Sequence, residues 1–69
     1  MNIHDLPRTE ISALIDEWIL NERNRDILKR RFCDGIVFER LAEEFELSVT
    51  QVKNIVYRSQ KIILEHADK

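Results

Sequence analysis

Residues 38–57, FERLAEEFELSVTQVKNIVY, contain the spacing that decides the fold of this chain. The fourth, eighth, tenth, fifteenth and eighteenth places of this stretch are apolar, namely Leu41, Phe45, Leu47, Val52 and Ile55. The fifth place holds Ala42, whose small side chain lets two helices approach closely, and Ser48 can cap the second of them. The pattern predicts a helix-turn-helix: a helix over 38–45, a short turn, and a last helix from about 49 to 66.

Two more helices are predicted upstream of this motif. Residues 9–20, TEISALIDEWIL, place apolar side chains on one helical face, with Pro7 just upstream as a helix starter and Thr9 as a possible cap. Asn21 breaks the pattern and can cap a second helix over 22–33. Gly35, the only glycine, falls where a left-handed residue belongs after a helix end. We therefore predict an all-α fold, a compact four-helix domain with a C-terminal helix-turn-helix.

Length and composition predict one small domain, residues 1–69, and exclude several classes of function. A single cysteine, Cys33, excludes an internal disulfide and a multi-cysteine zinc site. His4 and His66 have no neighbours at ligand spacing, so we expect no metal and no cofactor. There is no Ser/His/Asp or Cys/His constellation and no glycine-rich phosphate loop, so we expect no enzyme. Without a signal peptide or an apolar run of about 20 residues, we expect a cytoplasmic protein with no membrane partner.

The charge of the chain is distributed unevenly along its length. The net charge at pH 7 is −2, which by itself disfavours binding to nucleic acid. Residues 1–47 hold seven Lys or Arg against eleven Asp or Glu, whereas residues 48–69 hold four against two. The C-terminal third, with a net charge of +2, is therefore where we expect an anionic partner to bind.

The last predicted helix has two chemically different sides, read at about 100° per residue. Its apolar side contains Val49, Val52, Ile55, Val56, Ser59, Ile62 and Ile63. Its opposite side contains Thr50, Gln51, Lys53, Asn54, Tyr57, Arg58 and Lys61. The second side has amides, hydroxyls and cations but no carboxylate, and such groups bind base edges and phosphates. An ordinary solvated face accounts for this side equally well, and only the helix-turn-helix spacing favours DNA over it.

Residues 21–64 contain RDILKRRF followed by DG, then FERLAEEFELS, and then VKN leading into the last helix. This arrangement resembles the C-terminal promoter-reading domain of bacterial sigma factors, and response-regulator output domains share much of it. The resemblance implies that the start of the last helix lies in the major groove and that Arg58 contacts the DNA backbone. It implies that five residues lie near bases or phosphates, namely Val49, Thr50, Gln51, Lys53 and Asn54. The larger sigma domain that binds core polymerase is absent, so we do not expect a complete sigma factor.

We predict a sequence-specific duplex DNA-binding transcriptional regulator of bacterial or phage type. The predicted DNA-binding residues are Ser48, Val49, Thr50, Gln51, Lys53, Asn54, Tyr57, Arg58 and Lys61. Gln51 and Asn54 are candidates for bidentate contacts with adenine, and Thr50 can contact a thymine methyl group. Ser48 caps the helix, whose exposed N-terminal amides can bind a phosphate. The cations are expected to bind phosphates, which supplies affinity with little specificity.

The alternative is a protein-interaction module that binds RNA polymerase or a sigma or anti-sigma partner without specific DNA recognition. The net negative charge and the acidic first half favour this alternative. Because the chain has few basic groups, we expect one copy to bind DNA weakly. Recruitment by RNA polymerase, or a homodimer with Ile62 and Ile63 at its seam, would supply the missing affinity.

Three positions give expectations that a structure tests directly. Glu46 stands at the turn, where glycine is usual because the backbone becomes left-handed, so we expect Glu46→Gly to stabilise the fold. Arg31 lies on the apolar side of its helix, and we expect a partly buried ion pair with Glu39 or Glu43 rather than a DNA contact. Trp18 is expected in the core, with a dimer seam as the alternative.

A basic cluster on the second predicted helix has two interpretations. Its members are Arg23, Arg25, Lys29 and Arg30. They suit phosphate contacts near the last helix, or a solvated face balanced by Glu22 and Asp26, which we favour. Cys33 is expected to be a small buried or half-buried side chain.

Overall fold

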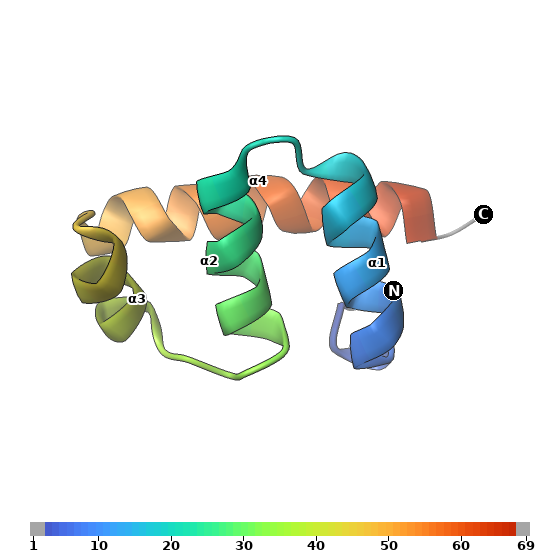
Figure 1. Ribbon diagram of the computed structural model, residues 1–69, viewed down its shortest axis with the longest axis horizontal. Coiled ribbons are helices and arrows are strands. Elements are labelled where there is room, and N and C mark those ends of the chain that lie inside the picture. The colour runs from blue at the N-terminus through green and yellow to red at the C-terminus, as the bar shows by residue number, and fades with distance from the viewer. Residues whose placement is uncertain (1–2, 68–69) are drawn as a thin grey trace.

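The computed structural model describes residues 3–67, and four α-helices account for most of them (Figure 1). The elements are η1 (Ile3–Asp5, a single 3-10 turn), α1 (Arg8–Trp18), α2 (Glu22–Phe32), α3 (Phe38–Phe45) and α4 (Val49–Ala67). The long α4 runs the length of the molecule, and α1, α2 and α3 lie one after another along it (Figure 1). No strand occurs within residues 3–67, and the predicted all-α, four-helix fold is confirmed.

The starts of α1 and α2 differ in whether a side chain caps them. The Asn21 side chain accepts a hydrogen bond from the backbone N–H of Asn24 at 3.1 Å, so α2 begins after Asn21. α1 begins at Arg8 directly after Pro7, the predicted starter, but it has no side-chain cap, so the predicted cap by Thr9 is wrong. Thr9 lies inside the first turn of α1, one residue beyond its first helical position.

Two left-handed residues stand in the connections that bring α2, α3 and α4 together. Gly35 has φ of +71°, as its place after α2 predicts. Glu46 ends α3 with φ of 56° and ψ of 43°, and it is the only non-glycine residue with positive φ within residues 3–67. The N–H of Leu47 donates to the carbonyl of Ala42 at 2.9 Å, which closes this helix end as a Schellman motif. The turn between α3 and α4 therefore has the backbone that its position predicts.

The core lies between α4 and the three shorter helices. Its buried apolar members are Ile3, Ile11, Ile15, Ile19, Ile27, Leu28, Leu41, Ala42, Val52, Val56 and Ile63. Ile3 belongs to η1, which the sequence pattern did not predict, and its side chain is fully buried because η1 packs on α4. Leu41 and Ala42 are the buried residues of α3, and α3 packs against α4. This packing holds the two helices in one relative orientation.

The far end of α4 corrects two expectations about apolar residues. Trp18 is 38% exposed rather than enclosed in the core, and its indole stacks on the imidazole of His66 with 3.5 Å between ring centroids. Ile63 is fully buried, so it cannot form an exposed dimer seam together with the half-buried Ile62. α1 covers this part of α4, which the periodicity of α4 alone could not indicate.

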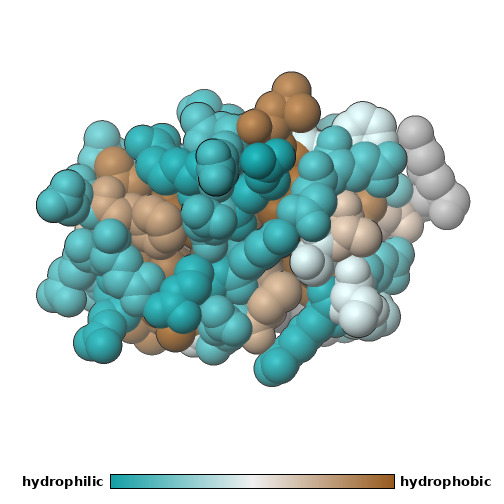
Figure 2. Space-filling model, viewed as in Figure 1, coloured by the Kyte–Doolittle hydropathy of each residue, from teal (hydrophilic) through white to brown (hydrophobic). Residues whose placement is uncertain are grey.

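The face seen in Figure 2 is largely hydrophilic, with apolar groups exposed beside α3 and at the connection between α1 and α2, where Leu20 is 85% exposed. Cys33 is half-buried, as predicted. None of the helices in residues 3–67 combines the length and the apolar character that crossing a bilayer requires.

Candidate nucleic-acid interface

The exposed side of α4 is the side that the helical periodicity predicts. Its exposed residues include Thr50, Gln51, Lys53, Asn54, Tyr57, Arg58 and Lys61. Four residues on the opposite side are buried, namely Val52, Val56, Ser59 and Ile63. Val49 is half-buried and Ser48 is exposed, so both lie at the edge of this surface. The structure therefore brings eight of the nine predicted residues together as exposed groups and leaves Val49 partly covered.

The start of α4 is closed by a reciprocal pair of hydrogen bonds. The N–H of Gln51 donates to the hydroxyl oxygen of Ser48 at 3.1 Å, and the N–H of Ser48 donates to Oε1 of Gln51 at 2.9 Å. This capping box satisfies two backbone donors and holds both side chains in place. A bidentate contact with adenine needs both ends of an amide, so Gln51 would have to leave the box to make one. Asn54 is exposed, and its side chain has no such role in the structure.

The first turn of α4 contains no acidic residue. A helix N-terminus has a partial positive charge from its unpaired N–H groups, and acidic side chains there commonly neutralise it. α1, α2 and α3 each have a glutamate in the first turn, namely Glu10, Glu22 and Glu39. The start of α4 thus differs from the other three in leaving this charge without a carboxylate.

An aromatic and cationic cluster, Arg31, Phe38, Lys53 and Tyr57, lies beside this surface. The Arg31 guanidinium lies over the Phe38 ring at 4.2 Å from its centroid, and the Lys53 ammonium lies 5.9 Å from the same centroid. Tyr57 meets Phe38 edge to face with 5.9 Å between ring centroids. Such contacts orient both cations. Sequence reasoning missed this cluster, although the spacing of Lys53 and Tyr57 by one helical turn is a signal that could have suggested it.

The expected ion pair of Arg31 with Glu39 or Glu43 is wrong. Its Nη1 donates instead to the backbone carbonyl of Ile36 at 3.0 Å, while its guanidinium plane covers Phe38. The half-buried position of Arg31 is therefore satisfied by a carbonyl and a ring, and a carboxylate is not required.

Two members of the basic cluster on α2, Lys29 and Arg30, form ion pairs, but not with the acids expected, whereas Arg23 and Arg25 form none of the ion pairs found within residues 3–67. Lys29 pairs with Asp16 of α1 at 2.7 Å, so its partner is on a neighbouring helix. Arg30 pairs with Asp34 at 3.3 Å, and its Nε donates to Oε2 of Glu44 on α3 at 3.2 Å. Glu22 and Asp26 form none of the ion pairs found within residues 3–67.

The Arg30–Glu44 contact shifts both groups in the direction that favours their charged forms. The hydrogen bond from Arg30 lowers the pKa of the Glu44 carboxyl, partial desolvation opposes the shift, and the charges of Arg30 and Arg40 add to it. The hydrogen bond to Glu44 likewise raises the pKa of Arg30. These two groups are therefore engaged with each other, away from the exposed side of α4.

The cations of α4 differ from Lys29 and Arg30 of α2, because none of them is paired with a carboxylate within residues 3–67. Lys53, Arg58 and Lys61 form none of the ion pairs found in the described part of the chain. Their charges are exposed and remain uncompensated by a paired carboxylate. The side of α4 that contains them can bind an anion without first breaking an ion pair.

Comparison with protein-family models, with curated proteins and with solved structures found no match. Among the described residues, no group of three or more His, Cys, Asp or Glu side chains lies together in a way that could hold a metal ion.

Proposed function

We propose that this protein binds duplex DNA sequence-specifically and regulates transcription, with the first half of α4 in the major groove. In this proposal α3 and α4 act as a helix-turn-helix, in keeping with the sequence resemblance of residues 21–64 to sigma-factor promoter-reading domains. α3 supports α4 from behind through Leu41 and Ala42, which leaves the opposite side of α4 free.

One observation carries the proposal: residues 49–61 expose cations, amides and hydroxyls, and none of these residues is acidic. The observation has weight because acidic residues outnumber basic ones in the whole chain, 13 to 11. An unpaired cationic surface at a helix start with no acid in its first turn is well suited to a polyanion.

The proposal gives different roles to residues along α4. Asn54 is the best candidate for a bidentate contact with adenine, because Gln51 is held in the capping box. Lys53 and Arg58 flank Asn54 and supply phosphate contacts, and Thr50 is placed for a thymine methyl group. The capping box uses the backbone N–H groups of Ser48 and Gln51, so a phosphate at the start of α4 would bind the N–H groups of Val49 and Thr50.

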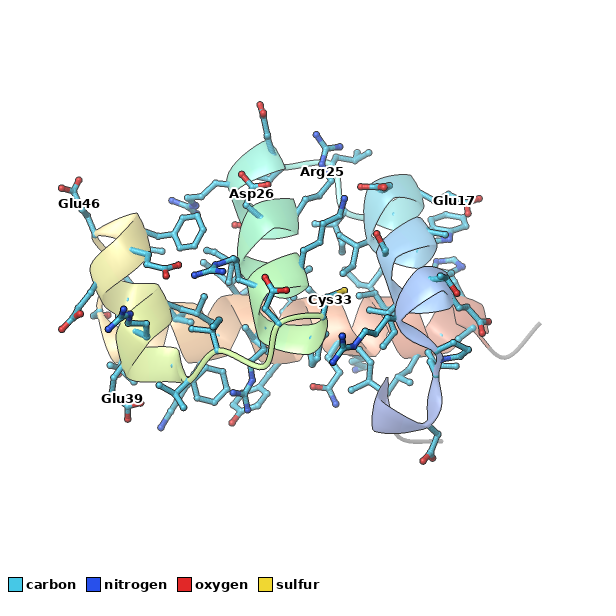
Figure 3. All side chains as sticks on the ribbon, turned by 60° about the horizontal axis from the view of Figure 1, so that its bottom comes forward. Glu17, Arg25, Asp26, Cys33, Glu39 and Glu46 are labelled. Carbon is cyan, nitrogen blue, oxygen red and sulfur yellow. The ribbon has the colours of Figure 1, made fainter. Side chains whose placement is uncertain are left out.

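A second candidate function is favoured by the acidic side of α3. Glu39 and Glu46 project from opposite ends of this helix, away from the body of the molecule (Figure 3), and Glu43 between them is exposed. Such a surface suits a basic protein surface, including one on RNA polymerase or on a sigma or anti-sigma partner. In that case the acidic side of α3, rather than α4, would carry the activity.

The test compares two substitutions that remove one positive charge each. Lys53→Ala is expected to weaken binding to every duplex and to lower the slope of log K against log salt by about 0.9. Lys29→Ala is the matched control, since Lys29 is already paired with Asp16 and lies on α2. Fluorescence anisotropy of a labelled duplex at several salt concentrations measures both. Equal effects of the two substitutions would contradict the proposal.

Two further variants distinguish recognition of DNA bases by α4 from binding of a protein partner by the acidic side of α3. Asn54→Ala is expected to relax preference at one base position, with a loss of about 1–3 kcal/mol in discrimination there. Glu43→Lys is expected to leave duplex binding intact or to strengthen it. If Glu43→Lys abolishes the biological effect while Lys53→Ala does not, the protein-interaction function is the correct one.

A further inference from the structure

The side chain of Gln51 is bound to the backbone at the start of α4. Its Oε1 accepts a hydrogen bond from the N–H of Ser48 at 2.9 Å, while its own N–H donates to the Ser48 hydroxyl oxygen at 3.1 Å. Because Ser48 precedes Gln51 by almost one helical turn, the first of these bonds draws the Gln51 side chain back along the helix. A base edge in the major groove lies outward from the helix axis, so the capping box directs this amide away from it.

Two amides of α4, on Gln51 and Asn54, differ in what a contact with a base would cost. A bidentate contact with adenine needs an oxygen that accepts from the amino group and a nitrogen that donates to the ring. Gln51 must leave Ser48 to offer both, and the Ser48 N–H then loses its partner. Asn54 is exposed, and its side chain takes part in none of the hydrogen bonds found within residues 3–67. Adenine therefore favours Asn54, whose amide breaks no bond of the folded chain.

The capping box also orders the residues that it encloses. The first turn of α4 has no acidic residue that would stabilise the helix start through its dipole, so the box supplies that stabilisation. Thr50 lies inside the box, and Asn54 follows one turn later, about 6 Å along the axis. Both side chains are exposed. A helix start that is ordered in the free chain brings them to DNA without the entropy cost of ordering them on binding.

We propose that Gln51 is a positioning residue, which stays in the capping box on DNA and holds Thr50 and Asn54 in place for contact with bases. This inference rests on the proposed DNA-binding function. It replaces the sequence-based expectation that Gln51 contacts adenine. The site bound by one copy then has one adenine recognised by an amide of α4, rather than two.

The test begins with Gln51→Glu, which keeps the box but cannot recognise adenine. Glutamate has an acceptor oxygen at the same place and is the other usual residue of a capping box, yet it lacks the amide N–H that adenine requires. We expect this variant to bind every duplex more weakly by one common factor, because it adds a negative charge. We expect each base preference to stay as in the wild type. Selection of binding sites from a random duplex pool, followed by sequencing, measures these preferences.

Gln51→Met has the opposite design, since methionine has a similar length but no oxygen to accept from Ser48. We expect a lower melting temperature. The dissociation constant for the selected duplex is expected to rise by up to about fivefold, the factor that corresponds to a helix cap of about 1 kcal/mol. Preference at the base that Thr50 contacts is expected to fall more than at the base that Asn54 contacts, because Thr50 lies inside the first turn. Fluorescence anisotropy with single-base variants of the duplex measures both.

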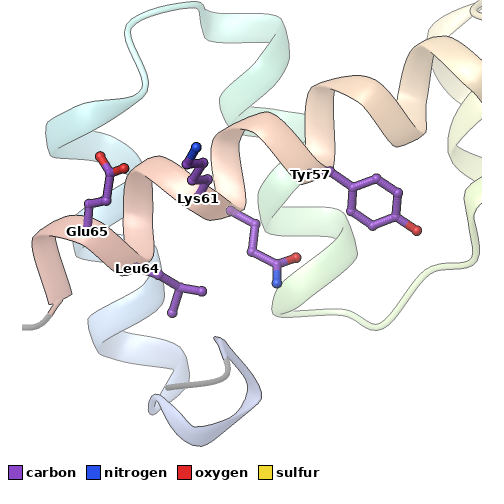
Figure 4. A pocket seen from close by; sticks show the side chains of 5 residues that line it. Tyr57, Lys61, Leu64 and Glu65 are labelled. Carbon is purple, nitrogen blue, oxygen red and sulfur yellow. The ribbon is translucent and has the colours of Figure 1, made fainter.

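Gln60→Glu is the matched control, because it makes the same chemical change on the same helix outside the capping box. Gln60 lies in the second half of α4, where five side chains line a shallow hollow, namely Tyr57, Gln60, Lys61, Leu64 and Glu65 (Figure 4). This variant is expected to weaken duplex binding no more than Gln51→Glu does and to leave the base preferences unchanged. It therefore calibrates the effect of one added negative charge on α4.

Hydrogen exchange measured by nuclear magnetic resonance follows the box itself, in the free chain and on the selected duplex. The Ser48 N–H is expected to exchange slowly in the wild type and in Gln51→Glu, and fast in Gln51→Met. In the wild-type complex it is expected to stay protected. Loss of this protection on binding overturns the proposal, and so does a Gln51→Glu variant that loses its preference at one base position.

Failure of the role of Gln51 and failure of the proposed function give different results. A wild-type chain that selects no motif contradicts the DNA-binding function, and the role of Gln51 on DNA fails with it. A wild-type chain that selects a motif, while Gln51→Glu changes the preference at one position of that motif, contradicts the role of Gln51 alone.

Discussion

Helices α3 and α4 pack against each other, yet their exposed sides have opposite chemistry. α3 exposes Glu39, Glu43, Glu44 and Glu46 around a single exposed cation, Arg40. Residues 49–61 of α4 contain no acid. The difference shows that a net charge of −2 is a poor guide to partners, because acids and bases are sorted onto neighbouring surfaces of the same small domain.

The two helices also begin differently. α3 starts after Val37, which has no side-chain cap, and has Glu39 in its first turn. α4 starts with the capping box of Ser48 and Gln51 and has no acid in its first turn. Neutral hydrogen bonds therefore stabilise the start of α4. The partial positive charge of this helix end is not neutralised by a carboxylate of its first turn, so it can attract an external anion.

The largest expected effect on stability comes from removing the packing contact between α3 and α4. Leu41 of α3 is fully buried, so Leu41→Ala removes apolar contacts and leaves a cavity. We expect the free energy of unfolding to fall by about 2–5 kcal/mol. Urea denaturation followed by circular dichroism measures it, with the exposed Glu43→Ala as a control expected to change stability by less than about 0.5 kcal/mol. A cost no larger than that of the control would mean that α3 does not hold α4 in place through Leu41.

The next largest effect on stability comes from changing the N-terminal caps of α3 and α4. Ser48→Ala removes the oxygen that accepts from Gln51, and we expect a loss of about 1 kcal/mol. Val37→Ser supplies a cap that α3 lacks, at a position where valine is exposed, and we expect a smaller gain in stability. Thermal or urea unfolding of both variants checks the comparison. If Ser48→Ala is neutral, the capping box does not stabilise α4.

The turn between the helices offers a gain in stability of similar or smaller size. Glu46 has left-handed backbone angles that strain a residue with a Cβ atom, and its side chain is exposed. We expect Glu46→Gly to raise the free energy of unfolding by about 0.5–1 kcal/mol, net of the flexibility that glycine adds to the unfolded chain. Glu46→Ala is the control, because it removes the carboxylate but keeps the Cβ atom. A lower melting temperature for the glycine variant would contradict the left-handed turn.

The smallest expected effect is a pH-dependent change in stability, and it involves Glu44, the acid of α3 that is paired with Arg30. Arg30 lowers the pKa of Glu44 in the folded chain, so the pair stabilises the fold above the ordinary glutamate pKa. This contribution is lost as the pH falls through the lowered pKa. The stability difference between wild type and Glu44→Gln is therefore expected at about pH 7 and expected to shrink at a pH below the ordinary glutamate pKa of about 4.3. Urea unfolding at both pH values measures it, and Glu43→Gln serves as the unpaired control.

Much of the fold could be predicted because local signals mark it. α3 has the bounds that the sequence predicts, and Asn21 and Ser48 cap helices as expected, since each needs only neighbours within one turn. The left-handed angles of Gly35 and Glu46 follow in the same way from their places beyond helix ends.

The errors concern contacts that local patterns do not determine. Arg31 binds a carbonyl and a ring instead of a carboxylate, because a long side chain can reach several partners and the tertiary fold selects among them. Trp18 is partly exposed instead of enclosed in the core, and Ile63 is buried instead of lying at a dimer seam, since the packing of α1 decides which residues near the end of α4 are covered. The exposed side of α4 was predictable from periodicity, whereas the Phe38 cluster and the capping role of Gln51 needed the structure.

The central claim is that the exposed first half of α4 reads duplex DNA. Selection of binding sites from a random duplex pool at low salt, followed by sequencing, tests it most directly. The account predicts an enriched motif that Asn54→Ala degrades at one base position. A pool that shows no enrichment over the unselected duplexes would contradict the claim.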